Sequence, residues 1–208
     1  EPHVILIGGD IAYANGKTKE LKRWDQWFDN MMKVMISPDG FLTPLIVAIG
    51  NHEVTTGIAL PWGQAPFYEQ IFAQENGKTF FTRNLGKNAT LLVLDSGHMK
   101  THSQQNDFIE DQLLIHKDTP HRLALYHAPL YPNHRDEFDA LANAGKNNWL
   151  SLFDKHQLTS AFENHDHTLK RTHILKENSI ADKGTVYVGD GCWGKNGRKS
   201  NPQKWYLQ

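Results

Sequence analysis

The sequence predicts an α/β domain in which much of the sheet is buried on both faces. Short apolar, β-branched runs alternate along the chain with segments whose apolar residues recur at helical spacing. Several of the runs are continuously apolar, as expected for strands that are covered on both sides. The length of 208 residues fits one domain with a sizeable core, or a large part of a bigger protein. We therefore treat residues 1–208 as one domain.

The first half of the chain predicts two strands and two helices. Strands are expected at residues 4–7 and 44–49, because both runs are apolar and both lead into glycine. Residues 18–35 place apolar side chains three and four positions apart, which predicts an amphipathic helix. A shorter helix is expected at residues 65–72.

The second half continues the alternation. A turn at Gly86 separates two β-rich runs and predicts a hairpin. From residue 195 onward the chain is polar and without a clear period, so we expect a tail or surface loop that packs through Trp205 and Tyr206. The elements expected here are strands at residues 79–83, 89–95, 123–126, 158–162 and 186–188, and helices at residues 104–116 and 149–156.

Composition limits the possible partners. Twenty-two basic and 23 acidic residues give a net charge of −1, so nothing favours nucleic acid or an anionic membrane surface. The single cysteine, Cys192, excludes an internal disulfide and a cysteine-based zinc site. No apolar run approaches the ~18 residues of a membrane span, and no signal peptide is visible after Glu1.

Metal-ligand residue types follow four of the predicted strands. Taken singly, each block has an ordinary interpretation as a turn, a helix cap or a hydrogen-bonded core histidine. Four such turns, each directly after a strand, are not expected by chance, and ligands gather at the carboxyl ends of strands in open α/β sheets. The blocks are Gly9-Asp10-Ile11-Ala12-Tyr13, Gly50-Asn51-His52-Glu53, Tyr126-His127-Ala128-Pro129 and Asn164-His165-Asp166-His167.

These donors suit two adjacent metal ions. Carboxylate, amide, phenol and imidazole groups without a thiolate favour Fe, Mn or Zn. In an extended backbone His165 and His167 would point to the same face, so both could reach one binuclear centre. Paired metal ions of this kind are typical of phosphate-ester hydrolysis.

In order and spacing the blocks resemble the calcineurin-like metallophosphoesterase superfamily. The tyrosine three residues after Asp10 resembles the purple acid phosphatase branch, and residues 162–172 (FENHDHTLKRT) are similar to its GHxHxYxR segment. The resemblance implies a two-layered sheet sandwich flanked by helices. It also implies N-terminal truncation, because the family's first Asp-x-His or Asp-x-Gly motif would lie upstream of Glu1. A second departure is Asn164, which replaces the glycine of GHxH.

The resemblance also implies a ligand set in which Asp10 bridges both metals. The pair would be Fe with Zn, Mn or a second Fe, and a tyrosinate ligand would favour Fe(III). One metal would be bound by Asp10, Tyr13, His167 and the upstream aspartate, and the other by Asp10, Asn51, His127 and His165.

Further roles follow from the same resemblance. His52 would be the acid that protonates the leaving oxygen, and His134 is a weaker candidate for a histidine that faces the substrate. Glu53 would hydrogen-bond a ligand histidine and fix its tautomer. Arg171, with Lys170, would either contact phosphate or remain solvated at a strand edge.

The resulting hypothesis is a metallophosphoesterase that uses a metal-bound hydroxide on a small-molecule phosphate ester. Phosphomonoesterase activity of the acid phosphatase kind is favoured. The alternatives are a phosphodiesterase with the same centre, or a catalytically impaired metal-binding domain, which the absent first motif motivates. Family analogy also predicts a secreted or periplasmic location.

Overall fold

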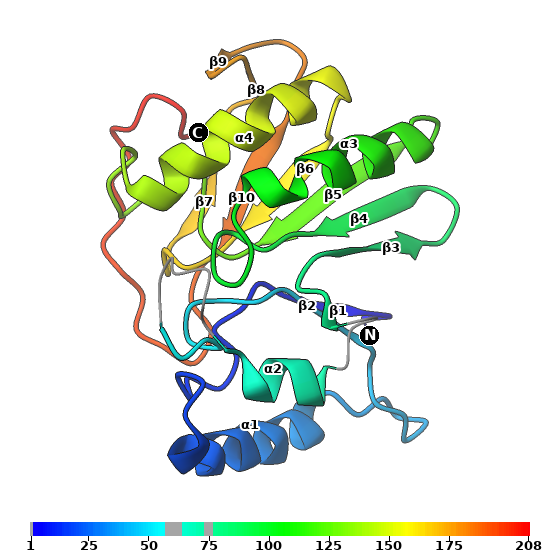
Figure 1. Ribbon diagram of the computed structural model, residues 1–208, viewed down its shortest axis with the longest axis vertical. Coiled ribbons are helices and arrows are strands. Elements are labelled where there is room, and N and C mark those ends of the chain that lie inside the picture. The colour runs from blue at the N-terminus through cyan, green and yellow to red at the C-terminus, as the bar shows by residue number, and fades with distance from the viewer. Residues whose placement is uncertain (1, 57–63, 73–76) are drawn as a thin grey trace.

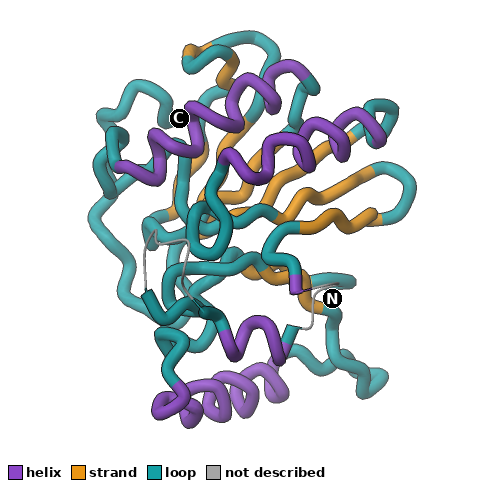
Figure 2. The backbone as a smooth tube through the Cα atoms, viewed as in Figure 1, coloured by secondary structure: helices purple, strands orange, loops and turns teal. Residues whose placement is uncertain are grey.

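The computed structural model describes residues 2–56, 64–72 and 77–208. Four layers are stacked in Figure 1: two helices, a small sheet, a six-stranded sheet and two further helices. Figure 2 shows the same layers by secondary structure, with long loops converging beside the small sheet. The mixed α/β architecture that the sequence predicts is therefore confirmed.

The small sheet consists of β1 (Ile5–Ile7) and β2 (Leu45–Val47), which pair in parallel with Ile5 opposite Leu45. Its outer face is covered by α1 (Leu21–Val34), which follows the short 3₁₀ turn η1 (Thr18–Glu20), and by α2 (Pro66–Ile71).

The large sheet has the strand order β3-β4-β5-β6-β10-β7. Its four inner strands are parallel, and its two outer strands run antiparallel to their neighbours. The strands are β3 (Phe81–Leu85), β4 (Ala89–Val93), β5 (His121–Tyr126), β6 (Ser160–Glu163), β7 (Leu169–Arg171) and β10 (Val186–Asp190).

Helices α3 (Asn106–Ile115) and α4 (Ala140–Lys155) cover the face of the large sheet that points away from the small sheet. The 3₁₀ turn η3 (Ser103–Gln105) leads into α3, and a two-residue hairpin of β8 (Leu175–Lys176) and β9 (Ser179–Ile180) lies at one end. Within the described residues, no helix is long and apolar enough to span a bilayer.

Two-residue alternation along the strands creates the separate cores of the sandwich. On β4, Leu91 and Val93 pack into the cluster between the two sheets, which includes Ala48 and the partly buried Leu6. The side chain between them, Leu92, belongs to the cluster beneath α3 and α4. Because neighbouring strand residues face opposite sides, one apolar run fills two cores.

Several elements differ from the sequence-based expectation, and the short strands β7, β8 and β9 are not predicted by the sequence at all. Helix α4 begins at Ala140 rather than at residue 149, because Asp139 caps it by accepting the Leu141 N–H at 2.9 Å. The first half of α4 consists mainly of small and polar residues with a weak helical pattern, so the sequence predicts only its second half. The hairpin strand expected at residues 79–83 lies at Phe81–Leu85.

The C-terminal segment is held by one of the two aromatic residues expected to anchor it. Tyr206 is fully buried and its hydroxyl donates to the Pro132 carbonyl at 2.5 Å. Trp205 remains 43% exposed, although its ring lies edge-on to that of Tyr206.

Two adjacent leucines on α3 can test which side chains belong to the core beneath α3 and α4. Leu113 is fully buried and Leu114 is 55% exposed. We expect Leu113→Ala to lower the free energy of unfolding by about 2–5 kcal/mol, because it removes buried methyl groups and leaves a cavity. The matched change Leu114→Ala should stay within about 0.5 kcal/mol. Urea denaturation measures both, and equal losses would contradict the packing described here.

Candidate metal centre

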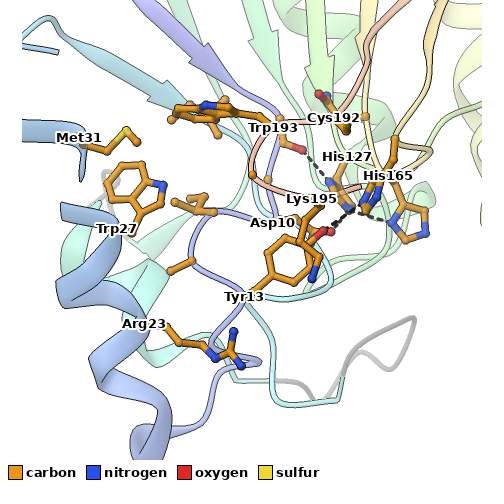
Figure 3. A pocket seen from close by; sticks show the side chains of 18 of the residues that line it. Asp10, Tyr13, Arg23, Trp27, Met31, His127, His165, Cys192, Trp193 and Lys195 are labelled. Atoms are coloured by element: carbon orange, nitrogen blue, oxygen red, sulfur yellow. Dashed lines mark hydrogen bonds and ion pairs between the residues drawn. The ribbon is translucent and has the colours of Figure 1, made fainter. Parts of the chain in front are cut away.

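Three predicted ligands meet at the carboxyl ends of the strands (Figure 3). Asp10 follows β1, His127 follows β5 and His165 follows β6, and one potential ligand atom from each lies within 4.8 Å of the others. The His127 Nε2 atom lies 3.2 Å from Asp10 Oδ2 and 3.0 Å from His165 Nδ1. The topology therefore brings together residues that are up to 155 positions apart in sequence.

A backbone carbonyl fixes the orientation of His127. The Gly8 carbonyl can only accept, so His127 Nδ1 donates to it at 2.6 Å, and Nε2 faces the cluster. Asn51 Oδ1 lies 3.1 Å from the same Nε2. Burial lowers the pKa of His127, but the adjacent Asp10 carboxylate and the bond to Gly8 together outweigh this and raise it overall. The Gly8 contact leaves Nε2 as the nitrogen that could bind a metal ion.

The donor geometry fits a bound ion. Two imidazole nitrogens that bind one ion at ~2.1 Å lie about 3.0 Å apart at a right angle and about 3.4 Å apart at the tetrahedral angle. The His127 Nε2 and His165 Nδ1 atoms are 3.0 Å apart, at the lower end of this range. Burial opposes ionisation of Asp10, yet the neighbouring His127 and His52 hold its pKa well below the usual range. The cluster therefore offers a carboxylate beside two imidazoles.

A second pair of predicted ligands lies beside this cluster. The Tyr13 hydroxyl is 3.1 Å from His167 Nε2. Burial and the nearby Asp10 charge raise the pKa of Tyr13. Asp10 thus lies close both to the two imidazoles of the cluster and to the Tyr13 phenol.

The backbone around the ligands differs from the extended form expected for the last block. His165 and His167 both have positive φ, 61° and 54°, so they are placed by turns rather than by strand alternation. Asp10 and Tyr13 are also left-handed, each with φ of 56°. Such conformations cost about 1–3 kcal/mol each for non-glycine residues and cluster at functional sites.

Glu53 holds backbone rather than a histidine, which corrects the expected contact. Its carboxylate accepts the N–H groups of Asp10 at 2.7 Å, Ile11 at 2.8 Å and Gly50 at 2.9 Å. Burial and the Asp10 charge raise its pKa to about 7. Gly50 must lack a side chain here, because a Cβ would lie 2.5 Å from the Asp10 nitrogen. Glu53 therefore joins the loops after β1 and β2.

His52 lies next to the cluster, as expected for a catalytic acid. Its Nδ1 donates to Asn15 Oδ1 at 2.5 Å, and its ring stacks on Tyr13 with centroids 4.0 Å apart. Its Nε2 lies 4.0 Å from Asp10 Oδ2. Burial lowers the pKa of the half-buried ring.

Two further predicted residues are not brought to the cluster. His134 is exposed, bonds the Lys199 carbonyl through Nδ1 at 2.8 Å, and lines a separate surface pocket with Trp205. Arg171 is exposed on β7 and contacts Gln208 Oε1. Their proposed roles in substrate binding stay predictions.

The loop at residues 191–198 contributes groups that the sequence did not single out. Lys195 Nζ lies 4.5 Å from the centre of the Tyr13 ring, and the Arg198 N–H donates to the His167 carbonyl at 3.0 Å. A cavity of about 510 Å³ runs past Asp10 and Tyr13 to Trp193 and Lys195. The polar, aperiodic sequence of this loop carried no ligand pattern that would have revealed it.

Asn164 shows how the substituted glycine is accommodated. It is not among the positive-φ residues, and its side-chain Nδ2 donates to the Tyr126 carbonyl at 2.9 Å. Gly8 makes the room, because a Cβ on it would lie 1.8 Å from Asn164 Nδ2. The replacement of the family's glycine by Asn164 is therefore accommodated by Gly8, which directly follows β1.

The fold and the cluster together define a metal-binding α/β sandwich with its site at the strand ends. Residues 1–173 match the calcineurin-like phosphoesterase family. The chain belongs to this family, whose chemistry implies metal ions.

Similar proteins agree with this assignment. The uncharacterised protein Rv2577 of Mycobacterium tuberculosis is 26% identical over 200 residues, covering 84% of this chain and 36% of that protein. Purple acid phosphatase PPD1 from yellow lupin seeds superposes with a TM-score of 0.77 at 19% identity, over 98% of this chain and 39% of that one. A dimetal phosphatase from Danio rerio superposes with a TM-score of 0.60 at 13% identity, over 90% of this chain and 71% of that one. The chain thus spans about a third of the curated relative's length.

The role of Glu53 can be tested by Glu53→Gln. Gln keeps one carbonyl oxygen, so at least one of the three backbone N–H bonds is lost and the Asp10 loop loosens. We expect Zn²⁺ affinity to fall about 10- to 100-fold, as for other groups that orient metal ligands. Isothermal titration calorimetry measures this, with the exposed Glu69→Gln as control. Unchanged affinity would contradict the role.

Proposed function

We propose that this protein hydrolyses phosphate esters at a binuclear metal centre, with small phosphomonoesters as the preferred substrates. The observation that carries the proposal is the convergence of Asp10, His127 and His165 beside the Tyr13–His167 pair. Family membership supports the reaction class.

The metal assignment rests on this geometry and on the family resemblance. His127, His165 and Asn51 form the first ligand group, and Tyr13 with His167 forms the second. Asp10 lies between them and is assigned the bridging role. Oxygen and nitrogen donors without sulfur favour Fe with Zn, Mn or a second Fe.

Within the described residues, Asp10 is the one carboxylate clustered with metal-binding histidines, and we propose that an aspartate outside residues 1–208 supplies a second one to the Tyr13–His167 group. The edge of β1 that faces away from β2 has no strand partner within the described residues. An apolar cavity of about 690 Å³, lined in part by Leu6, Leu125 and Phe162, lies next to it. An additional strand along β1 would fill this space and end near Asp10.

His52 is assigned the proton transfer to the leaving oxygen. Because its Nδ1 donates to Asn15, its Nε2 is the atom that faces the cluster. When bound, the metal ions supply a hydroxide nucleophile from water and neutralise charge on the phosphoryl group. Asp10 also accepts the His52 backbone N–H at 2.9 Å, which keeps the histidine beside the reacting atoms.

The metal requirement is tested with protein expressed from the complete gene. We expect elemental analysis to find about two ions per chain, and chelation to abolish hydrolysis of para-nitrophenyl phosphate until metal is restored. Hydrolysis of bis-para-nitrophenyl phosphate under the same conditions distinguishes the diesterase alternative. No metal uptake after reconstitution would refute the proposal.

The role of His52 is tested by His52→Ala. We expect kcat to fall about 10²-fold or more, because general acid catalysis is lost, while metal content stays unchanged. The exposed His121→Ala, at the far end of β5, is the control. An unaltered rate in His52→Ala would exclude the assigned proton transfer.

A further inference from the structure

A buried ion pair lies directly behind the imidazole cluster. Glu163 ends β6, two residues before His165, and Lys170 lies on β7, three residues after His167. Their side chains contact each other, with exposures of 0% for Glu163 and 1% for Lys170. Neither side chain can therefore reach a substrate, although the sequence had made Lys170 a candidate phosphate contact.

The sheet is built to let this pair form across a strand. Strand β10 lies between β6 and β7, and its Gly189 is opposite Lys170. A Cβ at Gly189 would lie 2.9 Å from Lys170 Cγ. The missing side chain thus leaves room for the aliphatic part of Lys170 to cross β10 towards Glu163.

Glu163 also holds the segment that follows His127. Its Oε1 accepts the Tyr126 hydroxyl and the Leu130 N–H, both at 2.7 Å, and its Oε2 accepts the Tyr131 N–H at 3.3 Å. Lys170 donates to the Tyr131 carbonyl. The pair therefore binds residues on both sides of His127 and is attached through its own strands to His165 and His167.

Stability alone is a weak explanation for such a pair. Burying two charges costs several kcal/mol per ion, and replacement by apolar residues of similar size is often neutral or stabilising. What the pair does do is connect two loops, each of which carries a predicted ligand. The His127 and His165 nitrogens that it supports are 3.0 Å apart.

We propose that Glu163 and Lys170 are positioning residues that fix the spacing of His127 and His165 for a single metal ion. This inference rests on the proposed metal centre, but it concerns residues that touch neither metal nor substrate. It gives the buried pair a function in setting metal affinity, and it predicts that the charges are dispensable for folding.

The test replaces both charges at once. Glu163→Met with Lys170→Met removes the pair without leaving an unpaired buried charge. We expect a folded protein by circular dichroism, with a midpoint of unfolding below that of the natural sequence, because the Tyr126 hydroxyl and the Leu130 and Tyr131 N–H groups lose their acceptor. Its Zn²⁺ affinity, measured by calorimetry, should fall about 10- to 100-fold. Relative to the natural sequence, the double variant should lose more activity at limiting Zn²⁺ than at saturating Zn²⁺, where its kcat should largely recover.

Single variants and a surface pair complete the design. Lys170→Met should weaken Zn²⁺ binding less than Glu163→Gln, because Glu163 keeps its Tyr126, Leu130 and Tyr131 donors. The surface pair Glu110–Lys155, changed to Gln and Met, should leave Zn²⁺ affinity unaltered. Natural-level Zn²⁺ affinity in the folded double variant would overturn the inference. Failure of the unaltered protein to bind Zn²⁺ would instead refute the proposed function.

Discussion

The Glu53 carboxylate is the contact on which the rest of the site depends. Its bonds to the Asp10, Ile11 and Gly50 nitrogens join the loops that leave β1 and β2. Unpaired, these buried N–H groups would each cost about 1–3 kcal/mol. The same contact fixes the Asp10 backbone beside His127 and His165, so the position of this predicted ligand is set by backbone hydrogen bonds rather than by strand geometry.

This constraint explains how Asp10, one of the predicted ligands, holds an unfavourable backbone conformation. Asp10, Tyr13, His165 and His167 are all left-handed. Such strain persists only where the surroundings overdetermine it. Around Asp10 the surroundings are Glu53 and the close approach of Gly50. The left-handed backbone directs these side chains toward the cluster, whereas a regular strand would direct them elsewhere.

The sequence predicted the parts of the molecule in which hydrophobic residues recur at a regular spacing or in which a ligand motif occurs. The alternating strands, helix α1 and the convergence of Asp10, His127 and His165 follow from hydrophobic pattern and from the positions of strand ends. Helix α4 began earlier than expected because a single cap, Asp139, starts a stretch with little apolar pattern. The position of His134 is set by non-local hydrogen bonds, which no spacing in the sequence reports.

Those bonds show that acidic neighbours of the ligands organise the opposite loop. Glu163 binds the Leu130 and Tyr131 nitrogens, and Asp166 accepts the His134 N–H at 2.6 Å and the Arg135 N–H at 3.0 Å. Both acids flank His165, yet both hold the segment that follows His127. The segment that carries the predicted metal ligands therefore also carries a second set of contacts. In these contacts, the acids near His165 hold the backbone that follows His127. The Lys170 ammonium is needed for only one of them, because the buried Asp166 has the partly exposed Arg135 beside it, 3.8 Å from Nε to Oδ1. Charge balance thus separates the two acids: Glu163 is paired with a fully buried lysine inside the sheet, and Asp166 with a partly exposed arginine of the loop after His127.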